Sequence, residues 1–298
     1  MSSTAFGHGP DRIRLGDLDV CRMGFGAMRL PGPDVWGPPA DADEARRVLR
    51  RAVDLGVELI DTSWYYGPFV ANELIAEALY PYPSQLVLAC KLGGKRLPDA
   101  SWAPFNRPEE LRIGCEHDLR TLRLERLDVV HLRWMNTGVP FAEQLDALIA
   151  LQAEGKIRHI ALSTVSAPMV EAALARTPIV AVQNLYNVTG GDGKLARMTH
   201  ALVESPDAVL DLCEARGIAY LPFFPLAVGQ VGAERPALLE IAARHGRTVF
   251  QVAIAWLLAR SKVMLPIPGT GRVAHLEDNW AARTLQLTPD EIAAIGAG

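Results

Sequence analysis

The stretch Ile60-Asp61-Thr62-Ser63-Trp64-Tyr65-Tyr66-Gly67-Pro68 decides how the rest of the chain is interpreted. It follows the apolar run 57–60, which predicts a short buried strand, and it precedes a helical pattern at 70–79. An acid at a strand end, followed five residues later by a tyrosine that stands before Gly-Pro, is suited to proton transfer. The stretch therefore predicts a strand, a loop that carries chemistry, and a helix.

Two further polar side chains stand where later apolar runs end. Lys91 closes one such run and His131 closes another. In a parallel barrel the carboxyl ends of the strands converge on one face, where catalysis takes place. We therefore expect Lys91 and His131 to meet Asp61 and Tyr66 on that face.

Short apolar runs alternate with helical patterns along the whole chain. No composition shift or linker divides the 298 residues, so we expect one domain covering 1–298. The alternation predicts an α/β protein, a (β/α)8 TIM barrel, which typically takes about 250 residues. The expected strands cover 23–26, 58–60, 86–90, 127–130, 157–162, 179–182, 218–221 and 263–265. The expected helices run from 41 or 43 to 55 and over 70–79, 107–122, 141–154, 167–176, 204–216 and 236–260, the last with a break at 245–246.

The chain before the barrel has two predicted parts. Residues 1–12 are polar and rich in Gly and Pro, which is typical of a loose tail. Residues 13–20 predict a hairpin with a two-residue turn at Gly16-Asp17. An open doubly wound sheet is the alternative fold. The loop 29–40 argues against it, because this Pro- and Gly-rich loop follows Gly24-Phe25-Gly26 where a nucleotide-binding turn would lead into a helix.

Composition narrows the class of protein. Apolar residues make up 49% of the chain, enough for a large core, and a net charge of −4 provides no basic surface for nucleic acid or for an anionic membrane. The four cysteines lack zinc-ligand spacing, so we expect thiols in a reducing compartment in preference to a disulfide framework. No metal site is expected. Without a signal peptide or a membrane span, the sequence predicts a cytoplasmic protein.

Several motifs, in their order along the chain, resemble those of the aldo-keto reductase family. They lie at 24–28, 61–67, 91–93, 131–133, 182–187 and 266–270, and the resemblance runs from about residue 15 to about residue 287. It implies that Asp61, Tyr66, Lys91 and His131 form a catalytic tetrad, and that the N-terminal hairpin closes the bottom of the barrel. It also implies reduction of an aldehyde or ketone, the small-molecule partner, with NADPH as cofactor.

Each tetrad member has an expected role. Tyr66 is the general acid, because it stands directly before Gly67 as in the family, and Tyr65 is the alternative. A free tyrosine has a pKa of about 10, so we expect the Lys91 ammonium to lower the pKa of Tyr66. We expect Asp61 to hold Lys91 charged and oriented, and His131 to donate a hydrogen bond to the substrate oxygen.

The resemblance also assigns cofactor contacts. Ser163 and Gln183 match positions that hold the nicotinamide carboxamide, and Thr164 stands where the family usually has Asn. Phe223 matches the aromatic ring that stacks under the nicotinamide. The complete expected set is Ser163, Thr164, Gln183, Phe223, Phe224, Leu226, Gly269, Thr270, Arg272, His275 and Asn279.

The segment from Gly269 to Asn279 matches the part of the family that binds the adenosine phosphate. Gly269 replaces a common lysine and His275 replaces a frequent arginine, which leaves Arg272 as the strong cation. A hydrogen bond to a charged group is worth about 1.5–3 kcal/mol. We therefore expect a preference for NADPH over NADH of roughly ten- to hundredfold.

The substrate is less constrained. The stretches 30–39, 78–82 and 223–226 resemble a bacterial branch of the family that includes pyridoxal reductases. Four tryptophans are expected to wall a pocket for a flat aromatic aldehyde, with loop packing as the alternative: Trp36, Trp64, Trp102 and Trp134. Two other functions remain open. One is a cofactor-binding sensor or accessory subunit on the same barrel, and the other is a Schiff-base lyase that uses Lys91.

Overall fold

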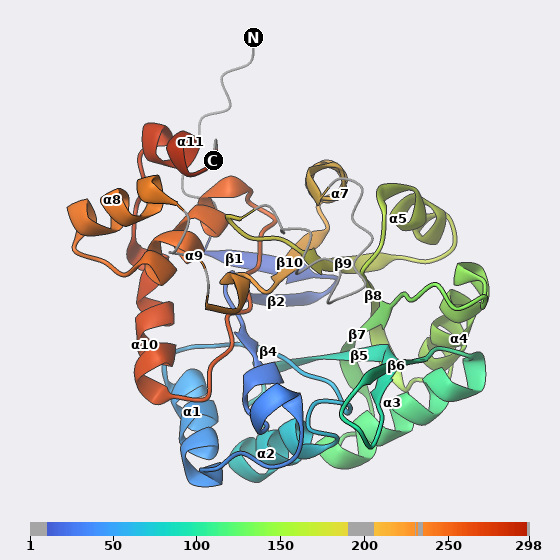
Figure 1. Cartoon of the computed structure of the whole chain (residues 1–298). Helices are drawn as coiled ribbons and strands as arrows, with labels where there is room; N and C mark the ends of the chain where they lie inside the picture. Colours follow the sequence, from blue (N-terminus) through green and yellow to red (C-terminus); the bar gives the residue numbers. More distant parts are fainter. Residues whose placement is uncertain (1–10, 190–205, 230, 232–234, 297–298) are drawn as a thin grey trace.

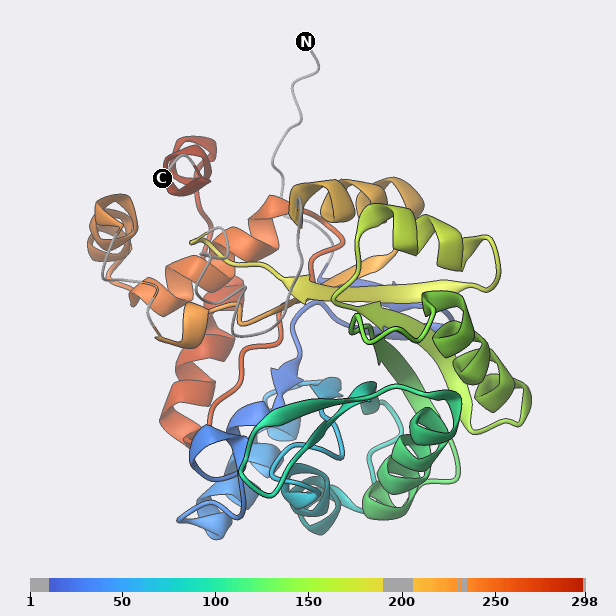
Figure 2. The same ribbon diagram turned by 45° about the vertical axis from the view of Figure 1, so that its right-hand side comes forward.

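Parallel strands form a curled sheet with helices on its outer side in the computed structural model, which describes residues 11–189, 206–229, 231 and 235–296 (Figures 1 and 2). Neighbouring strands follow the order of the chain, which is the arrangement of a (β/α)8 barrel. The strands are β3 (Phe25–Gly26), β4 (Leu59–Asp61), β5 (Val87–Arg96), β7 (Leu127–Arg133), β8 (Ile157–Ser163), β9 (Ile179–Leu185) and β10 (Ala219–Phe223).

The extended segment 263–268 closes the barrel between β10 and β3. On one side, the Tyr220 amide donates to the Val263 carbonyl and the Leu265 amide donates back to Tyr220, both at 2.8 Å. On the other side, the Gly24 amide donates to the Pro266 carbonyl at 2.9 Å. The expected eighth strand is therefore present as a short seam, because its two prolines have no N–H to continue the ladder. The predicted (β/α)8 fold is confirmed.

The helices follow the predicted pattern closely. Asp41 caps α1, accepting from the Glu44 amide at 2.8 Å, and Gly246, with φ of 58°, ends α8 at the predicted break. The first residues of the helix expected over 204–216 lie outside the described residues. The helices are α1 (Ala42–Asp54), α2 (Val70–Leu79), α3 (Pro108–Leu122), α4 (Phe141–Ala153), α5 (Ala167–Leu174), α7 (Pro206–Arg216), α8 (Pro236–His245), α9 (Val249–Arg260), α10 (Val273–Ala281) and α11 (Pro289–Gly296).

The N-terminal hairpin is present and begins earlier than expected. Strand β1 (Arg12–Leu15) pairs antiparallel with β2 (Leu18–Cys21) across the turn at Gly16 and Asp17. The predicted tail 1–12 is therefore too long, because Arg12 pairs with Cys21; residues 1–10 lie outside the described part. The loop 29–40 contains no α-helix, only 3-10 turns at Ala27–Arg29 and Pro33–Val35.

Strand β6 and helix α11 were not predicted from the sequence. Strand β5 continues past Lys91 to Arg96 and pairs antiparallel with β6 (Trp102–Phe105) (Figure 1). Gly93 permits this extension, because its φ of 115° suits glycine and because a side chain there would collide with the carbonyl of Arg133. The β5–β6 hairpin rises beside the carboxyl ends of the strands and carries Arg96 and Trp102.

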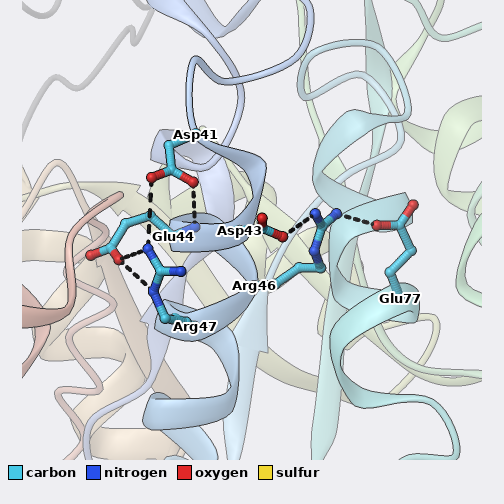
Figure 3. A network of polar contacts seen from close by, with 6 residues as sticks. All are labelled: Asp41, Asp43, Glu44, Arg46, Arg47 and Glu77. Atoms are coloured by element: carbon cyan, nitrogen blue, oxygen red, sulfur yellow. Dashed lines mark hydrogen bonds and ion pairs between the residues drawn. The ribbon is translucent and has the colours of Figure 1, made fainter.

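An ion pair joins α1 to α2 (Figure 3), and a hydrogen bond joins α1 to α10. Arg46 contacts Asp43 and also Glu77 of α2, both at 2.7 Å. Glu44 contacts Arg47 and accepts a hydrogen bond from the Val273 amide at the start of α10, at 3.0 Å. Exposed pairs of this kind each contribute about 0–1 kcal/mol, so they add little to the stability of the barrel. None of the described helices is long and apolar enough to cross a membrane.

Candidate active site

Asp61 ends β4, Lys91 and His131 lie in the carboxyl-terminal halves of β5 and β7, and Tyr66 lies on the loop that follows β4. Lys91 is the direct neighbour of His131 in the register between β5 and β7. All four side chains are buried, Tyr66 the least at 6% exposed. The structure therefore brings the four predicted catalytic residues to one end of the barrel.

Asp61 is the centre of a buried polar chain. One of its carboxylate oxygens forms an ion pair with the Lys91 ammonium, and the other accepts a hydrogen bond from the Gln183 amide at 2.7 Å. Lys91 Nζ also donates to the carbonyl of Thr62 at 3.3 Å and lies 5.2 Å from the centroid of the Tyr66 ring. A buried carboxylate needs such partners. The contacts with Asp61 and with the Thr62 carbonyl in turn hold the Lys91 ammonium against the face of the Tyr66 ring.

The pKa of Tyr66 differs from the expectation. Burial raises it well above 10, the negative charge of Asp61 raises it further, and Arg133 opposes this effect. The Lys91 ammonium, paired with Asp61 and 5.2 Å from the ring centroid, does not bring the pKa of Tyr66 below its ordinary value. Tyr66 is consequently a neutral phenol over the whole physiological range, and a neutral phenol can give up a proton when negative charge develops on a substrate oxygen.

His131 is neutral as well, because burial lowers its pKa to about 4. Its Nδ1 lies 3.3 Å from the Cys90 carbonyl, which can only accept, so Nδ1 carries the proton in this contact. The other nitrogen, Nε2, is buried and has no partner among the described residues. In this tautomer Nε2 accepts a hydrogen bond, whereas the expected role of donating to a substrate oxygen requires the proton on Nε2.

A cavity of about 950 Å³ connects this group of residues to the start of α10. Its wall includes Asp61, Tyr66 and Lys91 but not His131, which lies behind it. The wall also includes ten of the eleven expected cofactor residues: Ser163, Gln183, Phe223, Phe224, Leu226, Gly269, Thr270, Arg272, His275 and Asn279. A cavity of this size has room for a dinucleotide.

The eleventh expected residue, Thr164, is buried beside the cavity. Its φ of 61° lies in the left-handed region, which a β-branched residue rarely adopts. The Thr164 amide donates to the Gln183 carbonyl at 3.0 Å, and the Thr164 hydroxyl is 3.4 Å from that of Ser163. The backbone is thus strained where the chain turns away from β8.

The far end of the cavity lies where α10 begins. The Thr270 hydroxyl accepts from the Arg272 amide at 3.2 Å. The Val273 amide is engaged by the Glu44 carboxylate, and this hydrogen bond is the main reason that the pKa of Glu44 is lowered. The first amide of the helix is therefore not available to an anion, and Arg272 is the residue placed to contact one.

The four tryptophans have different positions, and only Trp102 is in the described cavity wall. Trp64 is 7% exposed and packs against Tyr65, Phe69, Phe105 and His117. Trp36 lies 5.6 Å from the guanidinium of Arg96, and Trp134 packs against the core. Loop packing, the alternative interpretation, describes Trp64 best.

Two charged residues near the site were not singled out from the sequence. Arg133 lines the cavity two residues after His131, a spacing that places both side chains on one face of β7. Asp118 is fully buried on α3, where it accepts from the Asn72 amide at 2.7 Å; Asn72 in turn accepts from the Thr62 hydroxyl at 2.8 Å. Burial raises the pKa of Asp118 to about 7. The sequence feature that could have identified Asp118 is its place as a carboxylate within the apolar stripe formed by Leu111, Cys115 and Leu122.

Comparisons with known proteins agree with this geometry. A solved thermostable aldo-keto reductase, in complex with the inhibitor epalrestat, matches with a TM-score of 0.80 and 27% identity, over 96% of this chain and 98% of that chain. An aldo/keto reductase from Klebsiella pneumoniae, solved in complex with NADP and acetate, has the same fold, with a TM-score of 0.75 and 24% identity over 96% and 94% of the two chains.

Relatives among curated proteins extend over the whole chain. The pyridoxine 4-dehydrogenase of Escherichia coli (strain K12) is 44% identical over 301 aligned positions, which cover 99% of this chain and 98% of the relative. The model of the Aldo/keto reductase family matches residues 22–297, a span that contains all four residues grouped around Tyr66 and the whole cavity wall. The chain therefore belongs to the aldo/keto reductase family.

Proposed function

We propose that this protein reduces an aldehyde or ketone to an alcohol with NADPH, and that Asp61, Tyr66, Lys91 and His131 are its catalytic residues. The observation that supports this most is the buried chain from Gln183 through Asp61 to Lys91, which ends against the Tyr66 ring at one end of the cavity.

The cavity suits NADPH in its volume and in the chemistry of its lining residues. Its inner part presents Phe223 for a flat ring and Ser163 for a carboxamide, and its outer part presents Arg272 for a phosphate. When bound there, NADPH supplies the hydride. The Klebsiella pneumoniae relative in complex with NADP supports the same use of the fold in this chain.

The protein residues handle the proton. As hydride reaches the carbonyl carbon, negative charge develops on the carbonyl oxygen, and the Tyr66 hydroxyl donates its proton there. The phenolate left behind is stabilised by the positive charges of Lys91 and Arg133. Asp61 keeps Lys91 in place, and the exclusion of water from this buried group strengthens each of these interactions.

The Schiff-base alternative agrees less well with the geometry. A nucleophilic lysine must lose its proton, whereas the Asp61 carboxylate forms an ion pair with the Lys91 ammonium. A sensor without chemistry has no need for the buried group around Tyr66. A cytoplasmic location remains a prediction from the sequence.

We further propose a flat aromatic aldehyde such as pyridoxal as substrate. Tyr65 and Trp102 form an aromatic wall near Tyr66, with ring centroids 5.8 Å apart and the planes at 85°. The similarity to a pyridoxine 4-dehydrogenase supports the same substrate class, because that name denotes oxidation of the corresponding alcohol.

The test monitors the oxidation of NADPH by its absorbance, with pyridoxal and with a simple aliphatic aldehyde as the two substrates. Tyr66→Phe should lower turnover at least about 100-fold while NADPH binding, measured by fluorescence, stays near wild type. Tyr65→Phe is the matched control, since it removes a hydroxyl from the adjacent ring. Wild-type turnover in Tyr66→Phe would refute the role of Tyr66, and wild-type enzyme that reduces the aliphatic aldehyde but not pyridoxal would refute the substrate.

A further inference from the structure

We propose that Asp118 is a positioning residue for the proton transfer: through Asn72 and Thr62 it fixes the carbonyl that holds Lys91, and its neutral form is the one that supports reduction. The inference rests on the proposed reductase function and adds a residue of the outer helix layer to it. It predicts that the rate of reduction depends on the charge of a side chain that touches neither substrate nor cofactor.

A chain of hydrogen bonds leads from Asp118 on α3 to the Lys91 ammonium. Asp118 Oδ1 accepts from the Asn72 amide of α2 at 2.7 Å. The Asn72 side-chain oxygen accepts from the Thr62 hydroxyl at 2.8 Å, and the Thr62 carbonyl accepts from Lys91 Nζ at 3.3 Å. A helix behind the barrel wall is thus connected to the cation that faces Tyr66.

The members of this chain are buried and fixed from more than one side. Thr62, Asn72 and Asp118 are fully buried. The Asn72 nitrogen also donates to the Thr121 hydroxyl at 3.0 Å, so its amide group is held with the nitrogen towards α3 and the oxygen towards Thr62. The Thr62 amide donates to the Ala89 carbonyl of β5 at 2.8 Å. Buried polar networks with such partners are rigid, so the Thr62 carbonyl has a defined position for Lys91.

The charge of Asp118 also acts on the catalytic group directly. Burial is the main cause that raises the pKa of Asp118, and the Lys91 charge opposes this effect. Burial is likewise the main cause of the high pKa of Tyr66, and a carboxylate at Asp118 raises it further. Because Tyr66 gives up its proton in the proposed reduction, a carboxylate at Asp118 opposes this step and a neutral carboxyl group does not.

The titratable neighbours of Asp118 behave differently near neutral pH. Burial raises the pKa of Cys90 well above 9 and that of Cys115 to about 12, and it lowers the pKa of His117 from 6.5. Lys91 is ion-paired with Asp61. Strand β6, which packs against α3, has no titratable side chain. The acidic residues of α2 and α4, the helices on either side of α3, are exposed to solvent: Glu73, Glu77, Glu143 and Asp146. Asp118, with a pKa of about 7, is therefore the member of this group that changes charge around neutrality.

The first test follows hydride transfer as a function of pH. Single turnovers with saturating NADPH are recorded by stopped flow from pH 6 to pH 9, with benzaldehyde, which has no group that titrates in this range. The wild-type rate should fall about 3- to 10-fold as pH rises, the size expected for one buried charge acting on a group that it does not touch. Asp118→Asn cannot ionise and should lose this decline. Asp211→Asn, at an exposed position of α7, is the matched control and should show the wild-type decline.

The second test interrupts the chain at Thr62. Thr62→Val keeps the shape of the side chain and removes the hydroxyl that Asn72 accepts from. The single-turnover rate at pH 6 should fall about 2- to 10-fold, the range for one neutral hydrogen bond. Thr62→Ser brings the hydroxyl back and should recover most of the rate. A role limited to folding would lower the melting temperature of Thr62→Val and leave the rate of the folded protein at the wild-type value.

The outcomes separate the two proposals. Wild-type enzyme that oxidises NADPH with neither benzaldehyde nor pyridoxal contradicts the reductase function itself. A wild-type rate that stays constant from pH 6 to pH 9 overturns the role of the Asp118 charge and leaves the reductase function standing, and this result requires no variant to fold. A decline that persists in Asp118→Asn overturns that role in the same way. A wild-type rate in Thr62→Val overturns the positioning of Lys91 through this chain.

Discussion

Replacing Asp118 by Asn should change how the stability of the barrel depends on pH. Asp118 is fully buried and its pKa is raised from 3.8 to about 7, chiefly because burial disfavours the carboxylate. The hydrogen bonds from Asn72 and from the backbone of Trp64 and the charge of Lys91 oppose that effect without cancelling it. The wild-type protein therefore holds a proton on Asp118 at pH 5 that the unfolded chain has already released.

The direction in which stability changes with pH follows from this difference between the folded and the unfolded state. Between the unfolded pKa and the folded pKa the native state binds more protons, so its stability falls as pH rises through this window. The full difference, about 7 minus 3.8, corresponds to roughly 4 kcal/mol at about 1.4 kcal/mol per unit. About 1.7 kcal/mol of this is already lost at pH 5, so the loss between pH 5 and pH 8 is about 2–3 kcal/mol.

Asp118→Asn resembles the protonated side chain in shape and cannot ionise. The variant should match the wild type within about 1 kcal/mol at pH 5, and at pH 8 its advantage should have grown by about 2–3 kcal/mol. Urea unfolding at both pH values, followed by circular dichroism, measures the difference. Asp211→Asn, at an exposed position of α7, is the control and should keep the wild-type pH profile. A gap between Asp118→Asn and the wild type that is the same at pH 5 and pH 8 would refute the reasoning.

Three further predictions concern the cavity. Arg272→Ala should weaken NADPH binding about ten- to hundredfold and leave NADH nearly unaffected, as titration by fluorescence will show; equal losses for both cofactors would mean that Arg272 only supports the turn before α10. Lys91→Met should lower turnover at least about 100-fold and leave Asp61 buried without its ion pair, so thermal unfolding should also shift downwards. An unchanged melting temperature would show that the pair contributes nothing to folding. Thr164→Asn should raise the unfolding free energy by about 1 kcal/mol, because Asn tolerates the left-handed backbone that Thr adopts there with strain, and a loss of stability would contradict that account.

The barrel was predictable because its signals are local. Each strand is a short apolar run, and most helices have clear ends, such as the caps at Asp41 and Gly246. The β5–β6 hairpin was not predictable, because Gly93-Gly94 and the residues after them lack alternation and depend on close contact with β7.

The site was predictable to a different extent for each residue. Lys91 and His131 could be placed from sequence because a polar side chain that ends an apolar run is conspicuous. The upward shift of the Tyr66 pKa could not be predicted from sequence, because it depends on burial and on the distance from Lys91. The same holds for Trp64, whose burial under Phe69 and Phe105 is a matter of tertiary packing.

The close packing of Gly26 and Gly269 where the barrel closes bears on how the newly made chain folds. A methyl group on Gly26 would lie 2.7 Å from the Ile267 carbonyl, and one on Gly269 would overlap the carbonyl of Gly26. Until residues 263–268 emerge from the ribosome, the edges of β3 and β10 stay open, and open edges invite pairing with other chains. The segment that closes them continues directly into the wall proposed for the cofactor. A cofactor bound against that wall would therefore also stabilise the closed barrel.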